Sequence, residues 1–273
     1  MTLTELRKTE HLSASAIGTY VECSLLYRFS KIDRLPIEQK SDSLEFGSAI
    51  HWVLEQYYQE KLIGEKLLLK DIHELFEKSW KMRAEDKTDI SYTKGHDFKS
   101  LLMLGKDLLT VWHQKLPTDN FTILGVEEAF SFFIPGIELP FIGGIDLIEE
   151  DSSGTILVTD HKTSSRAYSK DEVDLNQQLT LYQLGLKSMG YENREILLKF
   201  DCLIKRKNPS FEQYYTTRSE IDEHRLIRKY VQVWEGIKAE VFIPNDTSWK
   251  CPSCLYRKAC DEWFMKGGAH EQK

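Results

Sequence analysis

The chain has 273 residues, of which 41% are hydrophobic, and it contains 13 Phe, 12 Tyr and 6 Trp. This length and composition predict a packed globular protein, in one large domain or two small ones, and exclude a disordered chain. The formal net charge of -7 argues by itself against a nucleic-acid binder, although a site for divalent cations would account for part of the acidic excess.

No apolar run reaches the roughly 18 residues that are needed to cross a membrane. The first fifteen residues, MTLTELRKTEHLSAS, lack the apolar segment of a signal peptide. We therefore expect a cytoplasmic protein without membrane contact. In a reducing compartment the five cysteines would not form structural disulfides, so clustered cysteines indicate a metal.

Residues 1–12 are expected to form a loose or accessory leader. Ser13 then supplies a hydroxyl N-cap for a short helix that carries Ile17 and Tyr20, and this helix leads to Cys23. Cys23 lies far in sequence from the other clustered cysteines.

A longer helix is predicted from residue 43 to 62, with a broad apolar stripe along one side. Gly47 and His51 are four residues apart and lie on the same side of this helix. The glycine permits close approach of another backbone or a ligand, and a neutral histidine can ligate a metal. A half-buried polar histidine without a ligand is the alternative.

Two further helices are predicted between residues 67 and 116, separated by the polar stretch 84–97. We interpret about 64–116 as a helical insert to which the sequence assigns no chemistry. The sheet is expected to begin at residue 121 and to turn at Pro135-Gly136. Glu127 lies on this first strand, either near a functional site or on the surface.

The central stretch of the chain reads as a hairpin with strands at 142–148 and 155–159, joined by an Asp-Ser-Ser-Gly turn. Asp160 and Lys162 project from the same face because they are two residues apart, and the hairpin can bring Asp146 beside them. Converging carboxylates need a proton or a cation between them, and oxygen ligands suit Mg²⁺ or Mn²⁺. An exposed hairpin with ordinary polar residues is the alternative.

A helix is predicted to end near Leu186, and on it Gln178 and Tyr182 face the same direction at a spacing of i and i+4. This amide and phenol can bind a phosphate without adding charge, or they can form an ordinary helix surface. Strands are expected at 195–205 and 212–217, followed by a helix over 221–237.

Two features of the second strand pair carry weaker predictions. Cys202 lies between apolar neighbours and is expected to be a buried small residue rather than a ligand. A local cationic strip is possible, although a solvated strand end explains the same residues, namely Lys199, Lys205, Arg206 and Lys207.

The C-terminal stretch carries a cysteine cluster with the pattern C-x2-C-x5-C, formed by Cys251, Cys254 and Cys260. These three thiolates come from one turn and the helix after it. A metal site built on them needs a fourth ligand. Four sulfurs accept either zinc or a [4Fe-4S] cluster, and the spacing does not decide between them.

Taken together, these motifs resemble the PD-(D/E)xK nuclease superfamily. Asp160-His161-Lys162 resembles the D-x-K element and Asp146 stands at the first acid, although Ile145 replaces the usual proline. The segment LSASAIGTYVECSLLYRF resembles the opening of RecB- and AddB-type nucleases and of CRISPR-associated iron-sulfur exonucleases. Further matches are to the motifs G-x-x-x-H at Gly47, V-E-x-x-F at Val126 and Q-x-x-x-Y at Gln178.

The resemblance implies a single domain over 1–273 with an α/β, restriction-endonuclease-like core, in which helices flank a mixed central sheet. It implies that Lys162 positions a water and that Gln178 and Tyr182 bind the strand. It further implies a structural cluster, with zinc as the alternative, formed by Cys23 and the region 245–265. The implied Mg²⁺ or Mn²⁺ ligands are Asp146, Asp160, His51 and Glu127, and the implied cluster ligands are Cys23, Cys251, Cys254 and Cys260.

The expected function is that of a metal-dependent DNA nuclease, acting as an exonuclease on single-stranded ends. A first alternative is a non-catalytic or weakly catalytic partner subunit of a DNA-repair or CRISPR spacer-acquisition complex, with a helicase or an integrase as partner. A second alternative is a zinc-stapled binding protein with a degenerate site, against which the complete set of motifs argues.

Overall fold

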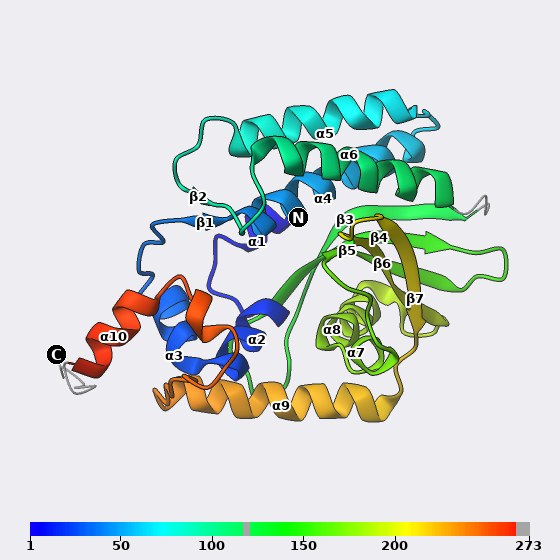
Figure 1. The fold of residues 1–273 in the computed structure, drawn as a ribbon. Coiled ribbons are helices and arrows are strands. Elements are labelled where there is room, and N and C mark those ends of the chain that lie inside the picture. Colours follow the sequence, from blue (N-terminus) through cyan, green and yellow to red (C-terminus); the bar gives the residue numbers. More distant parts are fainter. Residues whose placement is uncertain (117–120, 266–273) are drawn as a thin grey trace.

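The computed structural model describes residues 1–116 and 121–265 of the chain (Figure 1). At its centre lies a five-stranded sheet with the strand order β3-β4-β5-β6-β7. Neighbouring strands are antiparallel except β5 and β6, which run parallel, so the predicted mixed sheet is confirmed. The strands are β3 (Thr122–Phe132), β4 (Phe141–Glu150), β5 (Ile156–Ser164), β6 (Ile196–Ile204) and β7 (Ser210–Thr216).

The predicted hairpin is present as β4 and β5, and both strands extend beyond the predicted ends. Its turn is closed by the Asp151 carboxylate, which accepts hydrogen bonds from the backbone of Ser153 and Thr155, both at 2.9 Å. Gly154 has a φ of +87°, a conformation that glycine adopts without steric cost. The local turn residues therefore set the register that the site requires.

One face of the sheet is covered by the predicted helical insert together with the helix before it (Figure 1). These helices are α4 (Asp42–Leu62), α5 (Leu69–Ala84) and α6 (Phe98–Lys115). They share a core with the sheet in which Trp80 and Trp112 are fully buried. Helix α4 therefore belongs to the same layer as the insert.

The polar stretch 84–97 contains a short strand that the sequence did not indicate. Here β2 (Ile90–Ser91) pairs in parallel with β1 (Lys40–Ser41). The pairing is supported by Asp42, which is 1% exposed and accepts hydrogen bonds from the backbone N and the Oγ1 of Thr93 at 2.9 and 3.0 Å. The start of α4 is thus anchored to the connection between α5 and α6.

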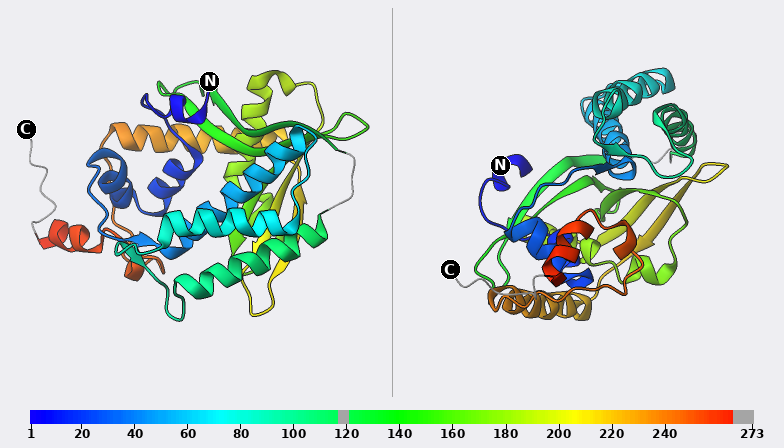
Figure 2. Two further views of the ribbon diagram at one scale, coloured as in Figure 1. Left: turned by 90° about the horizontal axis from the view of Figure 1, so that it is seen from above. Right: turned by 60° about the vertical axis from the view of Figure 1, so that its left-hand side comes forward.

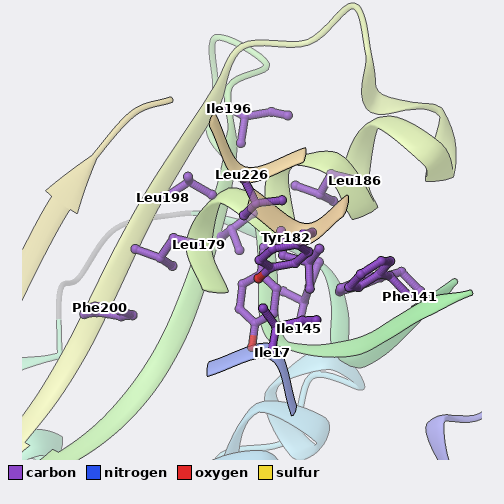
Figure 3. Close-up of a cluster of buried hydrophobic side chains, with 14 of the residues drawn as sticks. Ile17, Phe141, Ile145, Leu179, Tyr182, Leu186, Ile196, Leu198, Phe200 and Leu226 are labelled. Atoms are coloured by element: carbon purple, nitrogen blue, oxygen red, sulfur yellow. The ribbon is translucent and has the colours of Figure 1, made fainter. Parts of the chain in front are cut away.

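The opposite face of the sheet packs on α2 (Ala14–Glu22), α8 (Gln177–Leu186) and α9 (Glu220–Lys238). Figure 3 shows Leu179 and Tyr182 of α8 meeting Leu198 of β6 and Ile17 of α2. Figure 2 shows the two helical layers on opposite sides of the sheet. Two short elements accompany α8, namely α7 (Lys170–Asp174) and η2 (Lys187–Tyr191).

The expectation that residues 1–12 form a loose leader is wrong. Helix α1 (Leu3–Leu6) has a capping box and contacts β3 and β4. Leu12 is 1% exposed, and its backbone N donates to the carbonyl of Pro140 at 2.9 Å. The physical reason is that this polar segment adds backbone hydrogen bonds at the start of β4 and buries one large apolar side chain.

A third, smaller core joins the two ends of the chain. Leu25 of α3 (Ser24–Tyr27) and Phe29 of η1 (Arg28–Ile32) pack on Tyr256. Tyr256 lies between the short helix η3 (Cys251–Ser253) and α10 (Arg257–Met265). Figure 1 shows these blue and red segments side by side.

Gly105 tests how tightly the insert is packed. A Cβ at this position of α6 would lie 2.0 Å from Cζ of Phe76 in α5. We expect Gly105→Ala to lower the free energy of unfolding by about 1–3 kcal/mol through overpacking, in urea titrations. Gly18→Ala in α2 is the control, because nothing lies within 4 Å of its added Cβ, and it should gain up to about 1 kcal/mol. Equal effects at both positions would contradict this account of the packing.

Candidate metal centre

The pairing of β4 with β5 brings the two aspartates of the hairpin to the same place. The ladder pairs Leu147 with Thr159, and the next residues along it are Asp146 and Asp160. The backbone N of His161 donates to Oδ2 of Asp146 at 2.7 Å. Asp160 is 1% exposed and the Asp146 side chain is 11% exposed. Both carboxylates are thus nearly removed from water at the point where the β4–β5 ladder ends.

Helix α4 supplies a histidine from the insert layer. Nδ1 of His51 lies 3.5 Å from Oδ2 of Asp146. A close approach of α4 to the end of β5 makes this possible, since a Cβ at Gly47 would meet Oγ1 of Thr163 at 3.3 Å. Gly47 therefore permits a close approach, and the group that approaches it is the side chain of Thr163 in β5.

Glu127 reaches the same place through a strained backbone. Its φ of +53° lies in the left-handed region, which costs a residue with a side chain about 1–2 kcal/mol. Such residues interrupt a strand and redirect a side chain, and they are frequent at functional sites. The result is that ligand atoms of His51, Glu127 and Asp146 all lie within 4.8 Å of one another.

Burial and mutual repulsion govern the protonation of this cluster. Burial, followed by the Asp160 and Glu127 carboxylates, raises the pKa of Asp146 well above its usual value. Burial, followed by Glu55 and Asp160, raises the pKa of Glu127 to about 7. Burial also lowers the pKa of His51, which keeps its ring neutral. Crowded carboxylates beside a neutral imidazole form a donor set that fits Mg²⁺ or Mn²⁺.

Asp160 lies beside this group but is engaged by other side chains. Its Oδ2 pairs with Nζ of Lys162 at 2.6 Å, and its Oδ1 accepts from the Tyr182 hydroxyl at 3.0 Å. Lys162 also donates to Oε1 of Gln178 at 2.8 Å, and Nε2 of Gln178 donates to the Tyr182 oxygen at 2.7 Å. These four residues form a closed ring of contacts.

Two predicted site residues, Gln178 and Tyr182, take part in this ring. Burial raises the pKa of Tyr182 well above its usual value, so its hydroxyl stays protonated as a donor. Tyr182 is 3% exposed and turned towards Asp160, and Gln178 bonds to Lys162. The pair therefore orients the aspartate and the lysine. Both residues also line the groove that opens from the site, and their binding of a strand stays a prediction.

Lys162 remains cationic in this environment. Burial lowers its pKa, but the carboxylates of Asp160 and Asp146 outweigh burial, and the net shift is upward. Its ammonium lies on the α8 side of the sheet. His161, between Asp160 and Lys162, faces the insert and stacks on Tyr58 with ring centroids 5.6 Å apart.

Sequence reasoning missed two residues close to the site. Glu55 lies one helical turn after His51, and its charge contributes to the raised pKa of Glu127 after burial. The i,i+4 spacing from His51 was a usable signal for Glu55. Tyr168 follows β5 in a loop, and no signal in the sequence marked it.

The site opens into a groove of about 1300 Å³ between α2 and the α7–α8 segment. This volume exceeds that of ordinary small-molecule pockets, which measure roughly 300–1000 Å³. Glu127, Asp146 and Gln178 line it at the sheet, and Glu22 and Asn245 line it near the joined chain ends. The groove thus links the candidate metal centre to the cysteine region.

The four predicted cluster cysteines gather at that joined end of the molecule. Cys23, Cys254 and Cys260 pack around the small core of the chain ends. Burial, followed by the thiols of Cys23 and Cys251, raises the pKa of Cys260. Nη1 of Arg257 donates to Sγ of Cys251 at 3.1 Å. Sulfurs from both ends of the chain therefore share one region.

The remaining predictions concern the second strand pair. Cys202 is fully buried as predicted, and burial raises the pKa of its thiol to about 12. The suggested cationic strip does not form, because Lys199 is 4% exposed and pairs with Asp201 at 3.5 Å, and Arg206 pairs with Glu212 at 3.0 Å.

Among the described helices, none combines the length and apolarity that a membrane crossing requires.

The raised pKa of Glu127 gives a pH dependence that can be measured without substrate. A folded pKa of about 7 exceeds the ordinary value of 4.5, so the native state binds more protons in this window. Stability of the metal-free protein should therefore fall as pH rises from 4.5 to about 7, and Glu127→Gln should reduce this fall. Thermal unfolding in EDTA measures the stability of the wild type and of Glu127→Gln across this pH range. Glu128→Gln, at the exposed next residue, is the control and should behave like the wild type.

Comparison with known proteins gives a family match and solved structures with a similar fold. The model of the PD-(D/E)XK nuclease superfamily matches residues 11–261. A protein from Eubacterium rectale, described as "Putative exonuclease", has a similar structure with a TM-score of 0.53 and 12% identity, over 92% of this chain and 90% of that chain. At this identity the likeness concerns the fold alone.

A second solved structure, of SSO0001, has a TM-score of 0.36 and 14% identity, over 87% of this chain and 94% of that chain. That similarity is too low to support an argument. The comparison with curated protein sequences gives no match.

Proposed function

Because this chain belongs to the PD-(D/E)XK nuclease superfamily, we propose that it hydrolyses phosphodiester bonds of DNA with Mg²⁺ or Mn²⁺, as an exonuclease on single-stranded ends. The observation that carries the proposal is the grouping of His51, Glu127 and Asp146 within 4.8 Å, beside the ion pair of Asp160 and Lys162. Nucleases of this superfamily use divalent metals, and the donor set fits them.

In the proposed mechanism, His51, Glu127 and Asp146 would hold the cation, and Asp160 would add a carboxylate from the adjoining strand. The bound cation would lower the pKa of a water and neutralise charge on the phosphate. Lys162 orients the attacking water, because its ammonium is fixed by Asp160 at 2.6 Å and by Gln178 at 2.8 Å. The neutral His51 ring offers a nitrogen lone pair without having to lose a proton.

Gln178 and Tyr182 keep this arrangement rigid. The Tyr182 hydroxyl bonds to one carboxylate oxygen of Asp160 and Lys162 pairs with the other, and Gln178 bridges the tyrosine and the lysine. A positioned ammonium costs no reorganisation when charge develops on the phosphate. The groove beyond the site offers phosphate contacts rather than base-reading contacts, which implies little sequence preference.

The four cysteines are proposed to hold a structural [4Fe-4S] cluster, with zinc as the less favoured alternative. The support is the resemblance of the segment around Cys23, together with the C-x2-C-x5-C pattern of Cys251, Cys254 and Cys260, to nucleases that carry such a cluster. The structure agrees with a shared site in that Cys23, Cys254 and Cys260 pack around the same small core at the joined chain ends.

A partner-binding role in a larger complex is a second candidate function. It is favoured by exposed apolar side chains near the joined chain ends, including Trp249 at 83% and Ile243 at 65% exposure. Exposed apolar groups of this size are often covered by a partner. A helicase or an integrase subunit would suit the proposed DNA substrate, and co-purification with such a subunit would support this role.

An end-labelled assay tests the principal proposal. Purified protein with Mn²⁺ should degrade linear single-stranded DNA and leave covalently closed single-stranded circles intact, and EDTA should stop the reaction. Labels at the two ends report the direction of cleavage. Equal cutting of circles and linear strands would overturn exonuclease action, and no cutting of either would overturn hydrolysis.

A further inference from the structure

The groove that leaves the candidate metal centre carries basic side chains from three separate elements. Arg7 ends α1, Lys31 lies in η1 and Lys229 lies in α9, and all three line the groove. Within residues 1–116 and 121–265, none of the three has an ion-pair partner. Three cationic side chains without ion-pair partners thus line one groove, although the chain as a whole has a formal net charge of -7.

Two of the acids in the same groove are already neutralised. Glu172 is paired with Arg166. Glu22 is paired with Lys250 at 3.2 Å and accepts a hydrogen bond from Ser248 at 2.6 Å. Apart from the acids of the metal centre, Asp171 is the remaining carboxylate that lines the groove. Away from the metal centre, the groove therefore has an excess of positive charge.

One of the cations lies close to the reacting groups. Arg7 opposes the rise in the pKa of Glu127 that burial and Glu55 cause, which places its guanidinium within electrostatic range of the metal centre. The α8 side of the groove carries the neutral polar side chains of Asn176 and Gln177. Cations from three elements together with neutral hydrogen-bonding groups suit a charged backbone that lies along the groove.

We propose that this groove is the binding track for a single DNA strand, in which Arg7, Lys31 and Lys229 contact successive backbone phosphates next to the metal centre. This inference rests on the proposed nuclease function and assigns its substrate-binding residues. Each phosphate contact releases condensed counterions, so the affinity for a strand should fall with salt by a power of about 0.7 per contact.

The experiment compares the wild type with Arg7→Gln/Lys31→Gln/Lys229→Gln. Anisotropy of a labelled oligothymidylate, measured in EDTA over a series of KCl concentrations, gives affinity and salt slope. Loss of three contacts should reduce the slope by about 2 and weaken binding about 100-fold near 0.1 M salt. In Mn²⁺ the variant should cleave with a raised KM and a kcat close to that of the wild type, because no metal ligand is changed.

The control is Lys66→Gln/Lys78→Gln/Lys94→Gln, which removes the same charge from exposed positions of the insert outside the groove. It should bind with the wild-type slope. Thermal unfolding of each variant checks the fold. If the wild type binds and cleaves the strand but the groove variant matches the control, the track is overturned and the nuclease function stands. If the wild type neither binds nor cleaves, the proposed function itself falls.

Discussion

Replacing Asp160 by Asn is expected to reduce DNA cleavage by about 10³-fold or more while the protein stays folded. The substitution keeps the size of a fully buried side chain, and its amide oxygen can still accept from the Tyr182 hydroxyl. It removes the charge that holds Lys162 at 2.6 Å and one proposed metal ligand. The release of labelled nucleotides in Mn²⁺ measures the cleavage rate. Circular dichroism gives the folded fraction, by which the rate is divided.

Two further variants test whether the loss of cleavage in Asp160→Asn is specific to the candidate metal centre. Asp201→Asn is matched for burial and residue type, because Asp201 is 1% exposed on the neighbouring strand but faces the insert and pairs with Lys199. The folded fraction of this variant should cleave DNA at a rate within a few-fold of the wild-type rate. Tyr182→Phe removes one donor to Asp160 and should lose about ten-fold. Equal rates for Asp160→Asn and the wild type would remove the catalytic assignment.

If the four cysteines hold a metal as proposed, replacing Cys260 by Ala is expected to release it and to destabilise the protein by about 5 kcal/mol. The estimate follows from chain entropy, because ligation of Cys23 with the C-terminal cysteines closes a loop on the order of 200 residues. Loss of the ligand also leaves the remaining thiols packed around a small core. Urea unfolding and iron and zinc analysis measure the two effects, and a visible absorbance band would identify iron.

Cys202→Ala provides the matched control for the cysteine cluster. Cys202 is fully buried in β6, away from the other four cysteines. This variant should keep the wild-type metal content and lose only the stability of one small buried side chain. If Cys260→Ala binds as much metal as the wild type, Cys260 is not a ligand.

The layout of the sheet and of the hairpin could be predicted because their signals are local. Alternating apolar residues marked the strands, and the Asp-Ser-Ser-Gly turn set the register of β4 and β5. The placement of Asp160 and Lys162 on one face followed from their spacing alone. Their contact with each other at 2.6 Å agrees with that geometry.

Features that depend on contacts between distant segments were beyond the sequence. The left-handed backbone of Glu127 has no glycine or turn motif to indicate it, and only the packing of β3 on β4 produces it. The ordering of residues 1–12 likewise depends on a hydrogen bond from Leu12 to Pro140, far along the chain. The burial of Tyr182 likewise depends on how deeply α8 packs against the sheet, which the i,i+4 spacing of Gln178 and Tyr182 does not reveal.

Helix α4 serves two purposes at once. Phe46, Ile50 and Val53 lie in the interior of the insert layer, while His51 projects from the same turns towards Asp146. A molecule in which this layer has opened has therefore also lost its histidine from the metal centre. A small population of partly unfolded chains is present at any time, and under the proposed function those chains would be unable to cut DNA.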